Sequence, residues 1–108
     1  MTRINLTDDN GVQTANWFNR DSAEKFDEET YHNGQNWISK ATGSQWEHEA
    51  VYITPKKRFL LNRWSDFQGS TETYEIISKT DAVEWLIKNE YYEEVEAAYA
   101  ELLEKYEV

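Results

Sequence analysis

The sequence predicts a single α+β domain over residues 1–108, in which a short N-terminal helix and two C-terminal helices pack on a three-stranded antiparallel sheet (about 45–77). Two patterns predict this fold. Residues 45–77 alternate between apolar and polar side chains, with turn residues between the runs. Residues 78–108 instead repeat their apolar side chains at three- and four-residue intervals, which is the period of a helix. The length suits one domain.

The first part of the chain carries the weakest patterns. Arg3–Thr7 alternates as a short strand would, and a flexible end over residues 1–20 is the alternative. Asp21 followed by Glu24 three residues later is typical of a capping box. This pair predicts a short helix over Ser22–Glu29.

The middle of the chain predicts three strands in a meander, over Gln45–Thr54, Arg58–Ser65 and Glu72–Ile77. Pro55-Lys56-Lys57 supplies the first turn, and a polar segment containing Gly69 supplies the second. Within each strand, even-numbered residues share one face and odd-numbered residues share the other.

Two helices follow the strands. Ser78 is placed to cap the first helix, and Asn89 is a plausible residue for its C-terminal end. The second helix is predicted over Glu90–Val108. It has an apolar face and an almost purely acidic face, with seven Glu against the single Lys105. More than half of the net charge of −10 therefore lies in this segment.

The composition excludes several classes of function. A net charge of −10 disfavours direct binding of duplex DNA, which depends on Lys and Arg neutralising phosphates. The absence of Cys excludes a disulfide framework, a thiolate zinc site and a Cys nucleophile, and it fits a reducing cytoplasm. No segment resembles a membrane span or a signal peptide. We therefore expect a cytoplasmic protein that does not associate with membranes.

No motif points to catalysis, a cofactor or a metal. His48 lies between Glu47 and Glu49 on a predicted strand, so both carboxylates should point to the face opposite the imidazole. The other histidine, His32, lies beside a turn, and neither has the spacing of a metal motif. We expect structural or surface roles for both histidines and a protein that is not an enzyme.

The leading hypothesis is an acidic protein-interaction module that docks on a basic protein surface, such as that of a nucleic-acid-processing enzyme. Its predicted contact residues are Glu90, Glu93, Glu94, Glu101 and Glu104, helped by Asp27, Glu28 and Glu29. Two alternatives remain open for this helix. Its acidic face could serve only solubility, or its apolar face could form a homodimer through Tyr99, Leu102 and Tyr106.

A second hypothesis is a binder of single-stranded nucleic acid or of a small ligand on the sheet. It would use Lys57, Arg58, Arg63, Trp64 and Phe67, since aromatic rings stack on bases while cations pair with phosphates. The structural alternative is that the lysines solvate a turn and the rings fill the core. Trp64 and Phe67 are also candidate anchors for a protein partner, because exposed rings are favoured at interfaces.

The segment Thr42–Asn89 resembles a group of small uncharacterised bacterial proteins associated with mobile elements. The resemblance rests on Thr42–Glu49 (TGSQWEHE), on Trp64–Ser70 (WSDFQGS, of the form W-S-x-x-Q-G-S) and on Ala82–Leu86 (AVEWL). It implies a compact domain with a shared hairpin and helix. It also favours inhibitors carried by phages and plasmids, of the anti-CRISPR or anti-restriction type, which block a nucleic-acid-binding enzyme. The carboxylates of the predicted acidic helix would suit such a role, since carboxylates spaced along a rigid surface can imitate the phosphates of DNA.

Overall fold

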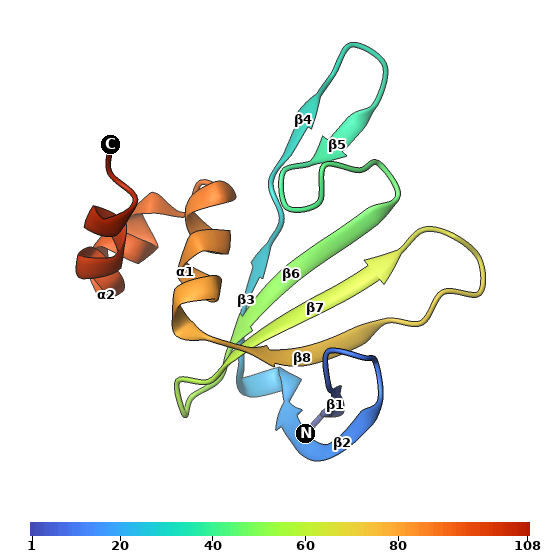
Figure 1. Cartoon of the computed structure of the whole chain (residues 1–108). Coiled ribbons are helices and arrows are strands. Elements are labelled where there is room, and N and C mark those ends of the chain that lie inside the picture. The colour runs from blue at the N-terminus through green and yellow to red at the C-terminus, as the bar shows by residue number, and fades with distance from the viewer.

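The computed structural model describes the whole chain, residues 1–108. The chain forms eight strands, a short 3-10 helix and two α-helices (Figure 1). In chain order the elements are β1 (Arg3–Thr7), β2 (Gln13–Asn19), η1 (Arg20–Ser22), β3 (Glu24–Asp27), β4 (Thr30–His32), β5 (Trp37–Ser39), β6 (Glu47–Ile53), β7 (Phe59–Ser65), β8 (Thr73–Ile77), α1 (Lys79–Lys88) and α2 (Tyr92–Lys105).

The central element is a four-stranded antiparallel sheet in the order β3-β6-β7-β8, beside two separate hairpins, β1–β2 and β4–β5. The α+β class is confirmed. The three predicted strands are present as β6, β7 and β8, each with bounds within two residues of those predicted. The prediction of a three-stranded sheet is wrong, because β3 adds a fourth strand next to β6.

The short helix predicted over Ser22–Glu29 is also wrong. The chain makes only the 3-10 turn η1 and then continues as β3, whose Phe26 lies opposite Val51 in the sheet and is buried. A helix here would have offered only Ala23 and Phe26 as apolar contacts, whereas a strand places Phe26 in the core and pairs its backbone with β6. The turn is capped by Asn19, whose Oδ1 accepts the Asp21 N–H at 3.2 Å.

One face of the sheet is covered by the two helices. Val51 of β6 and Leu61 of β7 form a buried cluster there with Val83 and Leu86 of α1 and Val95 of α2. These five side chains are aliphatic, and each is at most 7% exposed. Because Val51 and Leu61 are odd-numbered neighbours in the register, their positions follow the alternation that the sequence predicts.

The opposite face is covered by the β1–β2 hairpin. Tyr52, Leu60 and Tyr74 of the sheet form a second buried cluster with Leu6 of β1 and Phe18 of β2. The three rings of this cluster lie 5.5 to 5.9 Å apart between centroids, within the range in which aromatic pairs attract. The strand predicted over Arg3–Thr7 is β1, with the same bounds.

The ends of the helices follow the sequence closely. The Ser78 Oγ accepts the Asp81 N–H at 3.0 Å, so Ser78 caps α1 as predicted. Asn89 ends α1, and its buried side chain donates to the Trp85 carbonyl at 2.8 Å and accepts the Glu29 N–H at 2.9 Å. Glu90 then adopts a left-handed backbone, with φ of 69°. As a result, α2 is shorter than the predicted helix over Glu90–Val108. Neither helix combines the length and the apolar character that crossing a membrane requires.

Candidate protein-binding surface

Four of the carboxylates predicted to contact a partner lie on α2. Glu93, Glu94, Glu101 and Glu104 are exposed on this helix, and we call these four residues the acidic face. None of them forms an ion pair or accepts a hydrogen bond from another side chain. Glu90 differs, because it precedes the helix and lies 3.3 Å from the Lys40 ammonium group. The acidic face is therefore free to meet a cationic partner.

The apolar side of α2 is used within the chain. Val95 is fully buried, and Tyr99, Leu102 and Leu103 pack against the helix-covered core. Tyr99 has non-helical backbone angles (φ −141°, ψ 41°), and its ring packs edge-on against Phe59 with 6.0 Å between centroids. The residues predicted for a homodimer thus have an intramolecular role: Tyr99 and Leu102 in this packing, and Tyr106 through a 3.4 Å hydrogen bond that it donates to Glu84.

The three acidic residues expected to help the acidic face are engaged elsewhere. Asp27 pairs with Lys25 at 3.2 Å, and its backbone carbonyl accepts from the Tyr91 hydroxyl at 2.7 Å. The Glu29 carboxylate accepts the Thr30 N–H at 3.0 Å. Glu28 is nearly buried and belongs to a separate network around His48.

That network places His48 between two carboxylates. The His48 Nδ1 lies 2.6 Å from the Glu28 Oε2, and the His48 Nε2 lies 2.7 Å from the Asp66 Oδ2. Burial works against the charged imidazole, but the hydrogen bonds and charges of Glu28 and Asp66 outweigh it and raise the pKa of His48 above its ordinary value. With both ring nitrogens next to carboxylates, the charged imidazolium donates two hydrogen bonds.

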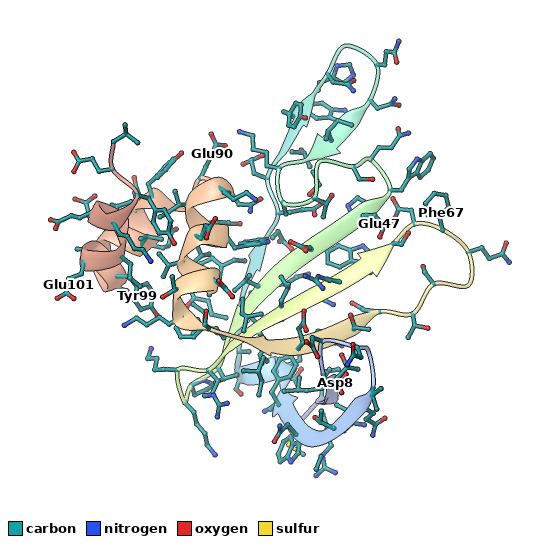
Figure 2. All side chains as sticks on the ribbon, in the orientation of Figure 1. Asp8, Glu47, Phe67, Glu90, Tyr99 and Glu101 are labelled. Atoms are coloured by element: carbon teal, nitrogen blue, oxygen red, sulfur yellow. The ribbon has the colours of Figure 1, made fainter.

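The His48 network fixes an aromatic end of the sheet. The imidazole stacks on Trp64, its partner across β6 and β7, with 5.5 Å between ring centroids. Beside them, the ring centroids of Trp46 and Phe67 lie 5.3 Å apart. Trp46 is 47% exposed and Phe67 is 56% exposed. Figure 2 shows Phe67 and Glu47 at the end of the molecule opposite Glu101. The aromatic residues predicted for partner binding and the acidic face of α2 therefore form two distinct surfaces.

The residues predicted for nucleic-acid or ligand binding on the sheet are likewise not brought together. Arg63 lies on the helix-covered face, where it pairs with Glu49 and Glu75 at 3.2 Å each. Trp64 and Phe67 belong to the aromatic end. Lys57 and Arg58 lie at the other end of β7, in the β6–β7 turn, and the strand between them and Trp64 spans about 20 Å.

Sequence reasoning missed the carboxylates that hold His48. It placed Glu47 and Glu49 away from the imidazole, and Glu49 does point to the other face, where it accepts from the Trp85 indole at 3.0 Å. The partners come instead from the end of β3 and from the β7–β8 loop. The register of the β6–β7 hairpin was a usable signal for Asp66, whose N–H donates to the Trp46 carbonyl at 2.9 Å. Glu28 could not be placed while its segment was assigned to a helix.

The structure contains no group of three or more His, Asp or Glu side chains arranged to hold a metal ion. Comparison of the chain with known protein families, with curated proteins and with solved structures finds no match. What the chain does must therefore be argued from its own surfaces.

Proposed function

We propose that this protein is a non-catalytic interaction module that acts in the cytoplasm by docking the acidic face of α2 on a basic surface of another protein. The observation that carries this proposal is the absence of any cationic partner for Glu93, Glu94, Glu101 and Glu104 within the chain. Four exposed like charges on one short helix repel one another, and a basic partner would relieve that repulsion.

A nucleic-acid-binding groove is the kind of surface that this face fits best. The four Glu of the acidic face lie on two helical segments that meet at a kink at Tyr99, and residues 93–104 would span roughly 17 Å in a straight helix. Duplex DNA carries about ten charges over the same length. The acidic face is thus a partial mimic, with less than half the charge of the duplex over that length. We propose that the protein inhibits a nucleic-acid-processing enzyme by occupying such a groove, as anti-CRISPR and anti-restriction proteins do. The resemblance to mobile-element proteins also supports this proposal.

The test is a pull-down from nuclease-treated bacterial lysate with three forms of the tagged protein, followed by mass spectrometry. The first form is the wild type, and the second carries Glu94→Lys, Glu101→Lys and Glu104→Lys. The third is a control with the same change in net charge, in which Asp9, Glu24 and Glu47 are changed to Lys. These three carboxylates are exposed, lie outside α2 and form no ion pair.

We expect the wild type and the control to capture the same basic nucleic-acid-binding protein, and the α2 variant to lose it. Binding should weaken steeply with added salt, because exposed charges are screened over about 10 Å at 0.1 M. Thermal unfolding should show that the α2 variant remains folded, since it loses no ion pair. If both variants lose the partner equally, binding depends on net charge and not on the acidic face. If the wild type captures no partner even at low salt, the proposal is refuted.

A further inference from the structure

The cationic side chains of this acidic protein are unevenly satisfied. Most of the eleven Lys and Arg contact a carboxylate, a tyrosine or an aromatic ring within the chain. The side chains of four of them make no such contact: Lys56, Lys57, Arg58 and Lys88. Three of these four are consecutive and lie in the β6–β7 turn. This turn is therefore the one place where unpaired positive charge gathers.

Hydrogen bonds fix the backbone of the turn that carries these cations. The Thr54 N–H donates to the Arg58 carbonyl at 3.0 Å, and the Lys57 N–H donates to the Thr54 carbonyl at 2.9 Å. Lys57 takes the left-handed conformation, with φ of 62°, which closes a three-residue hairpin loop of a common type. The Thr54 Oγ1 also accepts the Arg58 N–H at 3.1 Å.

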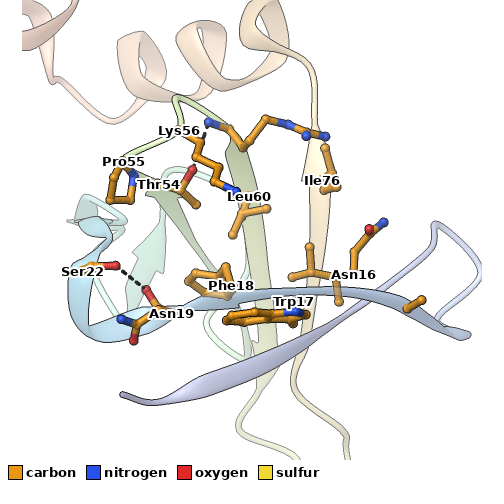
Figure 3. Close-up of a pocket in the computed structure, with 13 residues that line it drawn as sticks. Asn16, Trp17, Phe18, Asn19, Ser22, Thr54, Pro55, Lys56, Leu60 and Ile76 are labelled. Carbon is orange, nitrogen blue, oxygen red and sulfur yellow. Dashed lines mark hydrogen bonds between the residues drawn. The ribbon is translucent and has the colours of Figure 1, made fainter.

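A cavity opens next to this turn, between β2 of the hairpin and the sheet (Figure 3). Its volume is about 460 Å³, within the range of small-molecule sites. Phe18, Leu60 and Ile76 supply apolar wall, while Lys56 and Arg58 supply charge. Figure 3 shows Lys56 extending from the turn toward Leu60. The cavity lies on the hairpin-covered face of the sheet, so it is separate from the acidic face of α2.

The charged side chains that line this cavity are all positive. No Asp or Glu lines it, although the chain has 21 of them, and its other polar side chains are neutral ones such as Asn16, Asn19 and Ser22. Ile76, an apolar side chain on β8, is left 39% exposed at this site. A ligand that covers the apolar wall and places a negative group beside the turn would satisfy both features.

We propose that the cavity between β2 and the β6–β7 turn binds a small organic anion whose body is apolar and whose acidic group pairs with Lys56 and Arg58. The acidic group can be a carboxylate, a sulfonate or a phosphate monoester, since all three accept hydrogen bonds from these cations. The ligand site is independent of the proposed docking of α2.

The test uses two fluorescent probes that differ only in charge. One is 8-anilinonaphthalene-1-sulfonate, and the other is N-phenyl-1-naphthylamine, which has the same aromatic body without the sulfonate. Each is titrated into the wild type, into Lys56→Gln/Arg58→Gln and into Lys88→Gln. Lys88 is the unpaired cation that lies outside the β6–β7 turn, and it does not line the cavity. Near-ultraviolet circular dichroism checks that each variant keeps its fold.

We expect the sulfonate to bind the wild type at one saturable site, roughly tenfold more tightly than the neutral probe. Lys56→Gln/Arg58→Gln should lower the affinity for the sulfonate by roughly tenfold and change the affinity for the neutral probe by less than about twofold. Lys88→Gln should leave both probes unchanged. The proposal is overturned if binding is not saturable, if both probes bind equally, or if Lys88→Gln has the same effect as the double variant.

A second variant tests whether the probe binds in this cavity. Ile76→Glu adds a carboxylate to a position that is partly exposed, so the fold should tolerate it. It should abolish measurable binding of the sulfonate, because the new charge repels the anion. Unchanged affinity for the sulfonate would show that the probe binds elsewhere, and it would refute the proposed binding site.

Discussion

The two faces of the central sheet are covered by different kinds of structure, and their cores differ accordingly. On one face, α1 and α2 bring Val83, Leu86 and Val95 onto the sheet, and a recess with Glu49, Glu75 and Asp81 in its wall remains beside α1. On the other face, the β1–β2 hairpin brings mainly Phe18 and Leu6 against two tyrosines, and the cavity remains at its margin. Neither cover closes its sheet face completely. The two recesses differ in charge, because the one on the helix side has carboxylates in its wall and the one on the hairpin side has none.

The largest expected effect compares two leucines that are each 1% exposed, one in each core. Leu86→Ala should lower the free energy of unfolding by about 3–4 kcal/mol, because it leaves an enclosed void among α1, α2 and the sheet. Leu60→Ala should cost about 2 kcal/mol, because Leu60 lines the existing cavity and the new space can take up water. Urea unfolding of both variants measures the difference. Equal costs would show that Leu60 is as well enclosed as Leu86.

A smaller effect is expected for one side-chain hydrogen bond on each face of the sheet. The Trp85 indole donates to Glu49 at 3.0 Å on the helix side, and the Tyr74 hydroxyl donates to Glu72 at 3.1 Å on the hairpin side. Trp85→Phe should cost about 2 kcal/mol, since it removes both a charged hydrogen bond and ring volume. Tyr74→Phe should cost about 1 kcal/mol, since only the hydroxyl is lost. Urea unfolding measures both losses of stability. A larger loss for Tyr74→Phe than for Trp85→Phe would contradict the comparison.

The smallest effect is the dependence of stability on pH, and we assign it to the hairpin side. His48 and Trp64 share the parity of Tyr52 and Leu60, so the His48 network lies on that side of the sheet. The pKa of His48 is raised above 6.5 in the folded protein, so its contribution to stability is complete below pH 6.5 and is lost as the pH rises through the folded pKa.

The measurement is urea unfolding of the wild type and His48→Gln from pH 6 to 9. The difference between their free energies of unfolding should shrink as the pH rises above 6.5. The ion pairs of Arg63 with Glu49 and Glu75 on the helix side contain no histidine. A difference that stays constant with pH would show that the His48 network does not depend on the charged imidazole.

The sequence was sufficient where the decisive signals are local. The strands β6, β7 and β8 and the caps at Ser78 and Asn89 depend on alternation, turn residues and short-range hydrogen bonds. It failed at Ser22–Glu29, where the capping pattern at Asp21 is a local signal that the pairing of β3 with β6 overrides. The acidic face was recognisable because charge on a helix follows a simple period.

The features that join distant segments could not be predicted in the same way. The His48 network requires Glu28 and Asp66, which meet only once β3 lies on β6 and the β7–β8 loop folds back. The cavity likewise depends on how the β1–β2 hairpin sits against the sheet, which no short-range pattern encodes. The separation of Arg58 from Trp64 follows from the length of β7, and a count of residues along the strand would have shown it.

The strand order β3-β6-β7-β8 has a consequence for the order in which the chain can fold. The pairs β6–β7 and β7–β8 join neighbours in sequence, so each closes only a short loop. Joining β3 to β6 closes a loop of residues 28–49, which contains the whole β4–β5 hairpin and costs more chain entropy. The meander is therefore the natural nucleus, and β3 is expected to dock late, bringing Glu28 to His48 near the end of folding.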